Sequence, residues 1–110
     1  MSEDGWMPAL PLADLVDRKA TKVSVGGGDV LLVRDGDRLF AIGNRCTHQG
    51  APLHRGPVRF SGSLDTVQCP VHGSMFGLGD GKVLRGPAMQ PVPAYDARVH
   101  EGVIEIRRRD

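Results

Sequence analysis

A chain of 110 residues with a formal net charge of +1 suits one domain, and a domain of this size can bury a core without disulfides. A nearly neutral chain has little attraction for nucleic acid or anionic membranes, so we expect neither partner. No stretch approaches the roughly 18 apolar residues of a membrane span, and residues 1–14 lack the apolar run of a signal peptide. We therefore expect a single domain over residues 1–110, located in the cytoplasm.

The distribution of turn residues predicts an all-β chain. Fifteen glycines and eight prolines punctuate the sequence at the spacing that is typical of short strands. Residues 6–10 predict a first strand, and residues 11–16 leave room for one helical turn at most. Residues 22–25 and 29–34 then predict two strands that are joined by a glycine turn at 26–28.

The next hairpin is the strongest local signal for paired strands. Asp35 and Gly36 separate two apolar runs, and this dipeptide favours the positive φ values that a tight antiparallel turn requires. The alternation after the turn places Phe40 and Ile42 on one face of the second strand. We expect both side chains to face the core.

A loop-rich segment follows over residues 43–78, where the alternation fades and Gly, Pro, Cys and His accumulate. Within it, residues 65–68 predict a strand that leads to Cys69, and residues 74–78 predict a strand that leads away. We expect this segment to be a subdomain inserted between the strands of the base.

The remaining residues predict a return to paired strands. A short strand at 82–85 precedes an extended connector at 86–93, which is rich in proline. Residues 97–100 and 103–106 then predict a closing hairpin. The basic run Arg107–Arg109 is expected to be a solvated chain end.

The two cysteines and two of the four histidines lie in two short runs. One run carries Cys46 and His48 as C-x-H, and the other carries Cys69 and His72 as C-x-x-H. A thiolate and an imidazole in each run, with glycines close behind, are typical of a metal site. With two cysteines and no secretory signal, a disulfide is not expected, and the pattern indicates a reducing compartment.

The donor types alone leave the metal open. Two cysteines and two histidines can hold one zinc ion, which would make the chain a zinc-stabilised binding module. Zinc fingers, however, usually place their cysteines in one pair and their histidines in another. His54 and His100 lie outside both runs, and we expect no ligand role for either.

The sequence resembles the Rieske iron–sulfur family, whose fingerprint of C-x-H and C-x-x-H-G is matched by residues 46–48 and 69–73. The resemblance extends to residues 50–53, to the connector at 86–88 and to the hairpins on either side. It implies the all-β Rieske iron–sulfur fold, with an antiparallel β-sandwich-like base and an inserted cluster-binding subdomain at about 43–78. It also implies that the connector around Pro87 packs over the cluster.

Three positions distinguish branches of this family. Members in respiratory and photosynthetic cytochrome complexes carry an extra cysteine in each loop, joined as a disulfide, where this chain has Ala51 and Val71. Those members also carry a tyrosine where Phe76 stands, and they have a membrane anchor. The chain is therefore similar to the soluble ferredoxin branch.

The resemblance implies a Rieske-type [2Fe–2S] cluster. Cys46 and Cys69 would bind a buried inner iron, and His48 and His72 would bind an outer iron near the surface. Replacing two thiolates by neutral imidazoles raises the potential to about −150 to +300 mV, against about −400 mV for all-cysteine plant-type clusters. We expect a value in the lower part of this range, with Ser74 as a hydrogen-bond donor to sulfur.

We therefore expect a monomeric one-electron carrier that takes electrons from a flavin-containing reductase and passes them to a terminal oxygenase. No nucleophile–base pair is evident, so we expect no substrate chemistry on this chain. A small Rieske subunit that is fixed in a larger oxidoreductase remains an alternative. Residues 44–86 carry five basic and two acidic side chains, which leaves open both an acidic docking partner and a merely solvated surface.

Overall fold

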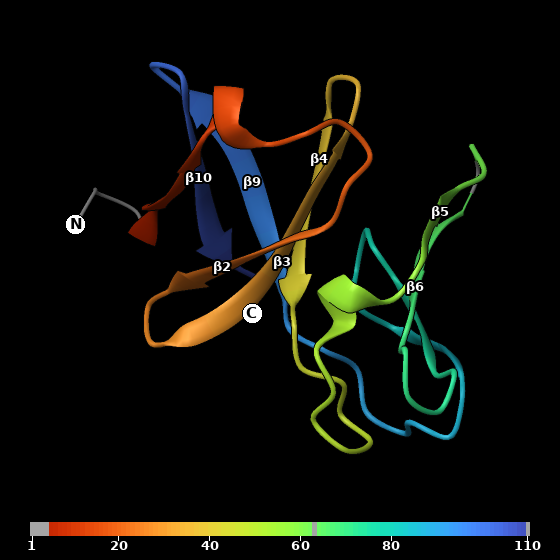
Figure 1. Ribbon diagram of the computed structural model, residues 1–110. Coiled ribbons are helices and arrows are strands. Elements are labelled where there is room, and N and C mark those ends of the chain that lie inside the picture. Colours follow the sequence, from red (N-terminus) through yellow and green to blue (C-terminus); the bar gives the residue numbers. More distant parts are fainter. Residues whose placement is uncertain (1–4, 63, 110) are drawn as a thin grey trace.

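The computed structural model describes residues 5–62 and 64–109, and its strands form two antiparallel sheets (Figure 1). The all-β prediction is thus confirmed. The larger sheet has the strand order β1-β10-β9-β4-β3-β2. Its strands are β1 (Met7–Pro11), β2 (Thr21–Val25), β3 (Gly28–Asp35), β4 (Arg38–Gly43), β9 (Ala94–His100) and β10 (Val103–Arg108).

The smaller sheet has the order β5-β6-β7-β8 and lies beside one end of the larger sheet (Figure 1). Its strands are β5 (Val58–Phe60), β6 (Asp65–Gln68), β7 (Met75–Gly77) and β8 (Val83–Arg85), and the two 3-10 turns are η2 (Leu12–Asp14) and η3 (Leu53–Arg55). The strand predicted at 65–68 has the bounds of β6. Because β8 lies beyond residue 78, the smaller sheet extends past the segment that we expected as the subdomain.

Strand β3 is buried on both faces, which explains its unbroken apolar run. Val30 and Leu32 pack in a core inside the larger sheet, whereas Leu31 and Val33 face a second core. Phe40 and Ile42 of β4 face this second core together, as predicted. The second core reaches into the smaller sheet, and its buried members are Leu31, Val33, Ile42, Cys46, Ala51, Leu53, Val67, Cys69, Phe76, Leu78, Ala88 and Val92.

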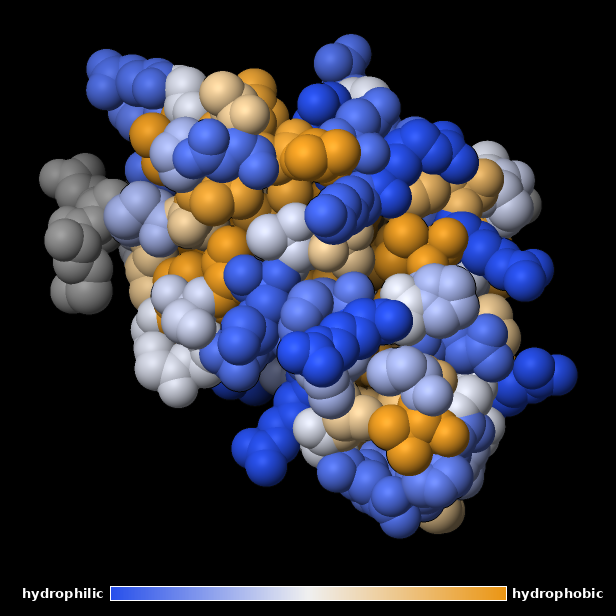
Figure 2. Space-filling model, in the orientation of Figure 1, coloured by the Kyte–Doolittle hydropathy of each residue, from blue (hydrophilic) through white to orange (hydrophobic). Residues whose placement is uncertain are grey.

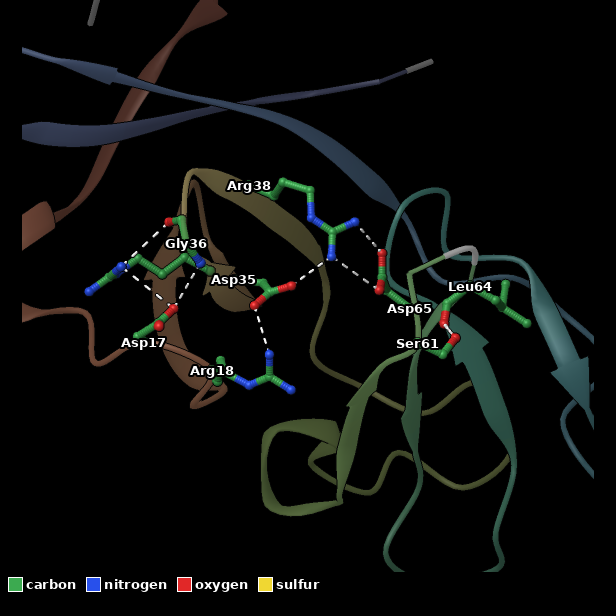
Figure 3. Close-up of polar contacts among 9 residues, drawn as sticks. Asp17, Arg18, Asp35, Gly36, Arg38, Ser61, Leu64 and Asp65 are labelled. Atoms are coloured by element: carbon green, nitrogen blue, oxygen red, sulfur yellow. Dashed lines mark hydrogen bonds and ion pairs between the residues drawn. The ribbon is translucent and has the colours of Figure 1, made fainter.

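A chain of ion pairs joins the two sheets at the surface (Figure 3). Arg38 of β4 binds Asp65 of β6 at 2.9 Å and Asp35 at 2.7 Å, and Asp35 also binds Arg18 at 2.9 Å. The hydrogen bond from Arg38 is the main cause that lowers the pKa of Asp35. Exposed pairs of this kind contribute little stability each, so they orient the junction more than they stabilise it.

The structure corrects the predicted turn of the first long hairpin. Asp35 pairs with Arg38 across the ladder, so the turn consists of Gly36 and Asp37, one residue later than predicted. Of these residues only Gly36 has a positive φ, at 60°. The closing hairpin is confirmed, since β9 and β10 are joined through residues 101–102.

The prediction of a solvated end at Arg107–Arg109 holds only in part, because Arg108 and Arg109 are exposed whereas Arg107 is half-buried. The first two of these residues belong to β10, and the guanidinium of Arg107 lies 4.5 Å from the centre of the Trp6 ring. Arg109 binds the carboxylate of Asp96 at 2.9 Å. Both partners come from other parts of the chain, so the basic run alone did not indicate them. Within residues 5–62 and 64–109, no helix has the length and apolar character needed to cross a membrane.

Gly56 lies directly after η3 and provides a test of how closely this turn packs against β6. A Cβ at Gly56 would overlap the carbonyl oxygen of Gln68 in β6, whereas a Cβ at Gly28 would meet no atom within 4 Å. Gly56→Ala should therefore lower the free energy of unfolding by about 1–3 kcal/mol through overpacking. Gly28→Ala should leave it unchanged or raise it by up to about 1 kcal/mol.

Urea denaturation of both variants measures the difference in their free energies of unfolding. The comparison requires that this free energy depends on urea concentration with the same slope in both variants. Equal midpoints for Gly56→Ala and Gly28→Ala would show that the close approach of η3 to β6 is not a constraint.

Candidate metal centre

The first metal-site run forms a loop after β4, which we call loop 1 (residues 44–52). Two backbone hydrogen bonds close it. The N–H of Cys46 donates to the oxygen of Ala51 at 2.9 Å, and the N–H of Gly50 donates to the oxygen of Cys46 at 2.7 Å. Gly50 has a φ of +77°, a conformation that L side chains rarely adopt. The loop buries Cys46 and leaves His48 exposed.

The second run forms loop 2 (residues 69–74) after β6 and repeats the same pattern. The N–H of Cys69 donates to the oxygen of Ser74 at 2.7 Å, and the N–H of Gly73 donates to the oxygen of Cys69 at 3.2 Å. Gly73 has a φ of +79°. Loop 2 also buries its cysteine and exposes its histidine, His72. The two loops are thus closed by equivalent bonds.

The two thiols lie in the second core. Cys46 and Cys69 are free, with only 2% and 4% of their surface exposed. Burial is the main cause that raises the pKa of the Cys46 thiol; the neighbouring Cys69 also raises it, while the N–H of His48 opposes the shift. Because metal binding requires thiolates, two of them buried together need a positive charge between them.

The two imidazoles lie together at the surface. The ring centres of His48 and His72 are 5.1 Å apart, and the ring planes are nearly perpendicular at 83°. Among the described residues no group of three or more His, Cys, Asp or Glu side chains is arranged to hold a single metal ion. The donors fit a two-metal group with sulfur ligands at its buried end and imidazoles at its exposed end, and they suit a mononuclear zinc site less well.

The other two histidines have different surroundings. Nδ1 of His54 lies 2.9 Å from the side-chain nitrogen of Asn44, which can donate to it. Burial, followed by the charges of Arg55 and Lys22, lowers the pKa of His54 and favours its neutral form. His100 lies on β9, where its nearest carboxylate is an exposed neighbour in sequence. Nothing in these contacts indicates a ligand role for either residue.

Sequence reasoning missed Asn44, a buried polar residue at the start of loop 1. Its Oδ1 accepts the N–H of His54 at 2.7 Å, and its backbone oxygen accepts the N–H of Leu53 at 2.8 Å. Its own N–H donates to the oxygen of Asp29 at 3.0 Å. Asn44 therefore fixes the base of loop 1 against both η3 and β3. A polar residue at the end of an apolar strand was the available signal.

The proline-rich connector contacts both loops. The hydroxyl of Thr47 donates to the oxygen of Gln90 at 2.6 Å, and the N–H of Ala88 donates to Oγ of Ser74 at 2.9 Å. Ala88 is buried in the second core, to which the two cysteines also belong. The position of the connector agrees with the expectation that the region around Pro87 packs over the site.

Comparisons with known proteins identify the family. A family model described as Rieske [2Fe-2S] domain matches residues 5–96. The chain is 33% identical over 98 residues to the 3-phenylpropionate/cinnamic acid dioxygenase ferredoxin subunit of Escherichia coli K12, and the match covers 89% of each. It is 32% identical over 94 residues to apoptosis-inducing factor 3 of Mus musculus, where the match covers 86% of this chain but only 15% of that protein.

Several solved structures share the fold at more than 25% identity. The ferredoxin of carbazole 1,9a-dioxygenase from Nocardioides aromaticivorans IC177 has a TM-score of 0.85 and 31% identity, over 96% of this chain and 100% of that one. A protein assigned as the NADH-dependent nitrite reductase small subunit of Mycobacterium tuberculosis has a TM-score of 0.80 and 31% identity, over 96% and 95%. A chain in a complex of oxygenase and ferredoxin in carbazole 1,9a-dioxygenase has a TM-score of 0.78 and 27% identity, over 93% of this chain and 92% of that one.

The family match covers most of the chain, and the two loops present the cysteines and histidines of the fingerprint as one buried pair and one exposed pair. The chain belongs to the Rieske [2Fe-2S] family, and a Rieske-type [2Fe–2S] cluster is its cofactor.

Proposed function

We propose that the chain is a one-electron carrier. The observation that supports this most directly is the division of the donors, with two buried thiols in the second core and two exposed imidazoles 5.1 Å apart. Such a site insulates one side of the cofactor and presents the other side to a partner. The similarity to dioxygenase ferredoxin subunits supports the same role.

In this proposal Cys46 and Cys69 hold the inner iron, and His48 and His72 hold the outer iron. The cluster, when bound, accepts and releases one electron. The chain supplies the rest: the second core excludes water from the sulfur ligands, and the two loops hold the imidazole edges at the surface. We assign the chain an electron-transfer role and no substrate chemistry of its own, which the similarity to dioxygenase ferredoxin subunits supports.

We further propose that the partners are a flavin-containing reductase and a terminal oxygenase. The ferredoxin subunit of the E. coli dioxygenase and the complex of oxygenase with ferredoxin in carbazole 1,9a-dioxygenase support this pairing. The surface of the two loops and the connector suits brief contact, because Val71 within loop 2 is 56% exposed and Met89 within the connector is 88% exposed. Exposed apolar side chains within a polar rim are typical of protein interfaces.

A second candidate is a small subunit that stays fixed in a larger oxidoreductase. The similarity to the nitrite reductase small subunit favours it. Sedimentation of the purified protein decides between the two. A monomer that a separate flavin reductase reduces rapidly is expected for the carrier, and stable copurification with a catalytic subunit would contradict it.

Removal of one imidazole tests the ligand assignment. His72→Ala should abolish or alter the EPR spectrum of the reduced protein, because one of the four donors is lost. Circular dichroism should show that the strands persist, since His72 is exposed. His100→Ala is the matched control, and its spectrum should equal that of the unmodified protein. An unchanged EPR spectrum for His72→Ala, or a colourless protein that contains zinc, would overturn the assignment.

Removal of the Ser74 hydroxyl tests how the potential is set. Ser74 is fully buried, and its Oγ accepts the N–H of Ala88, which leaves its proton available to a sulfur ligand. A hydrogen bond of about 0.5–1.5 kcal/mol that is stronger in the reduced state corresponds to about 20–65 mV for one electron.

We expect the unmodified protein to have a potential in the lower part of the range of about −150 to +300 mV. The potential of Ser74→Ala should be lower than this value by about 20–65 mV. A redox titration that is monitored by visible absorption measures the potentials of both proteins. A potential near the upper end of the range, or an equal potential for Ser74→Ala, would contradict this account.

A further inference from the structure

An open groove of about 970 Å³ runs beside loop 1. Besides loop 1, its lining includes residues of η3, residues around the β2–β3 turn, and one residue each of β9 and β10. His48, a proposed ligand of the outer iron, also lines the groove. Figure 2 shows hydrophilic side chains gathered across the region between the two sheets on the face that carries η3. The groove is thus continuous with the exposed edge of the metal centre.

The charged lining of the groove is strongly basic. Four cationic side chains line it, against a single carboxylate, Asp29, and the cations are Lys22, Arg45, Arg55 and Arg108. This is an excess of three positive charges. The whole chain has a net charge of +1, so the rest of the molecule carries a net charge of −2. Positive charge is therefore in excess in the groove beside His48, whereas the rest of the molecule is net negative.

None of these four cations forms an ion pair with a residue in the part of the chain that the structure describes, and all four are exposed. Most of the other arginines do form ion pairs. Six of them bind carboxylates, and these are Arg18, Arg34, Arg38, Arg98, Arg107 and Arg109. The groove therefore holds cations whose counter-charge must come from outside the described chain or from solvent.

The position of Arg45 connects the groove to the site of electron exit. Its side chain lies against Gly50 of loop 1, where a Cβ would stand 3.1 Å from Nε of Arg45. Because Gly50 has no side chain, the guanidinium can lie along the loop that carries His48. An anionic group bound to Arg45 would lie along loop 1, which also carries His48.

We propose that this groove is the docking site for a carboxylate-rich segment of the electron-transfer partner protein, and this rests on the proposed carrier function. The four cations come from four different segments of the chain, namely β2, loop 1, η3 and β10, and all line one open groove, which suits an extended acidic segment better than one small anion. A partner held there has its own redox group close to His48, where transfer is fastest. Complementary charge would also accelerate the encounter at low salt.

Charge reversal on the holoprotein tests the proposal. The probe is a fluorescein-labelled peptide of ten glutamates, and its binding is followed by anisotropy at low salt. Arg45→Glu/Arg55→Glu should weaken binding by about tenfold or more, and added salt should weaken binding to the unmodified protein. Lys22→Glu/Arg55→Glu, which leaves the residue next to Cys46 untouched, should have a similar effect.

The matched control is Arg59→Glu/Arg85→Glu, which changes the charge equally. These arginines line a separate depression of about 100 Å³ on the smaller sheet, and they too lack ion pairs with described residues. The control should lose less than about threefold in affinity, as expected for long-range charge effects. Equal losses in groove and control variants would overturn the proposal, and so would equally tight binding of a ten-nucleotide oligothymidylate.

A kinetic readout links binding to electron exit. Oxidation of the reduced holoprotein by ferricyanide, an anion, should slow by about fivefold or more in Arg45→Glu/Arg55→Glu. Oxidation by the cation tris(phenanthroline)cobalt(III) should not slow. If the EPR spectrum is normal but neither rate responds specifically to the groove, the docking proposal fails while the carrier function stands. If the unmodified protein lacks a Rieske EPR spectrum, the carrier function itself fails.

Discussion

The double burial of the β3–β4 hairpin is the constraint on which the rest of the structure depends. Alternate side chains of β3 fill two different cores, so a slip of one residue would exchange the occupants of both. This fixes the register of β4, and β4 in turn fixes where loop 1 begins. Asn44 then bonds to β3 and η3, so the position of Cys46 follows from the packing of apolar side chains that precede it.

The same packing explains how one site combines two opposed demands. The thiols require a dry environment, and they obtain it as members of a core that includes Leu53 and Phe76. The imidazoles require access to a partner, and short loops closed by equivalent hydrogen bonds place them on the outer side. Each loop reverses direction within six residues, so its cysteine and histidine face opposite environments. Glycine in the left-handed conformation makes this reversal sterically acceptable.

Local pattern was sufficient to predict most of the strands, though not β5, and to propose the four donors, because alternation and motif spacing are properties of neighbouring residues. The limits of β6 and the shared face of Phe40 and Ile42 agree with the structure for this reason. What the sequence could not indicate depends on distant partners. Asn44 has its role only because η3 folds back onto it, and Arg107 has its role only because Trp6 reaches β10. The turn at Gly36 lies one residue later than predicted, because Asp35 is still paired with Arg38 in the ladder.

The connector has a consequence for the order in which the protein folds. Each loop closes through bonds between residues at most five apart, whereas the bond from Thr47 to Gln90 spans 43 residues. Local closures form readily, and contacts of long sequence separation carry a larger entropic cost and form later. On this ground we expect the connector to close over the two cysteines after the two loops have formed. Before the connector packs over them, the two thiols would remain accessible for assembly of the iron–sulfur cluster.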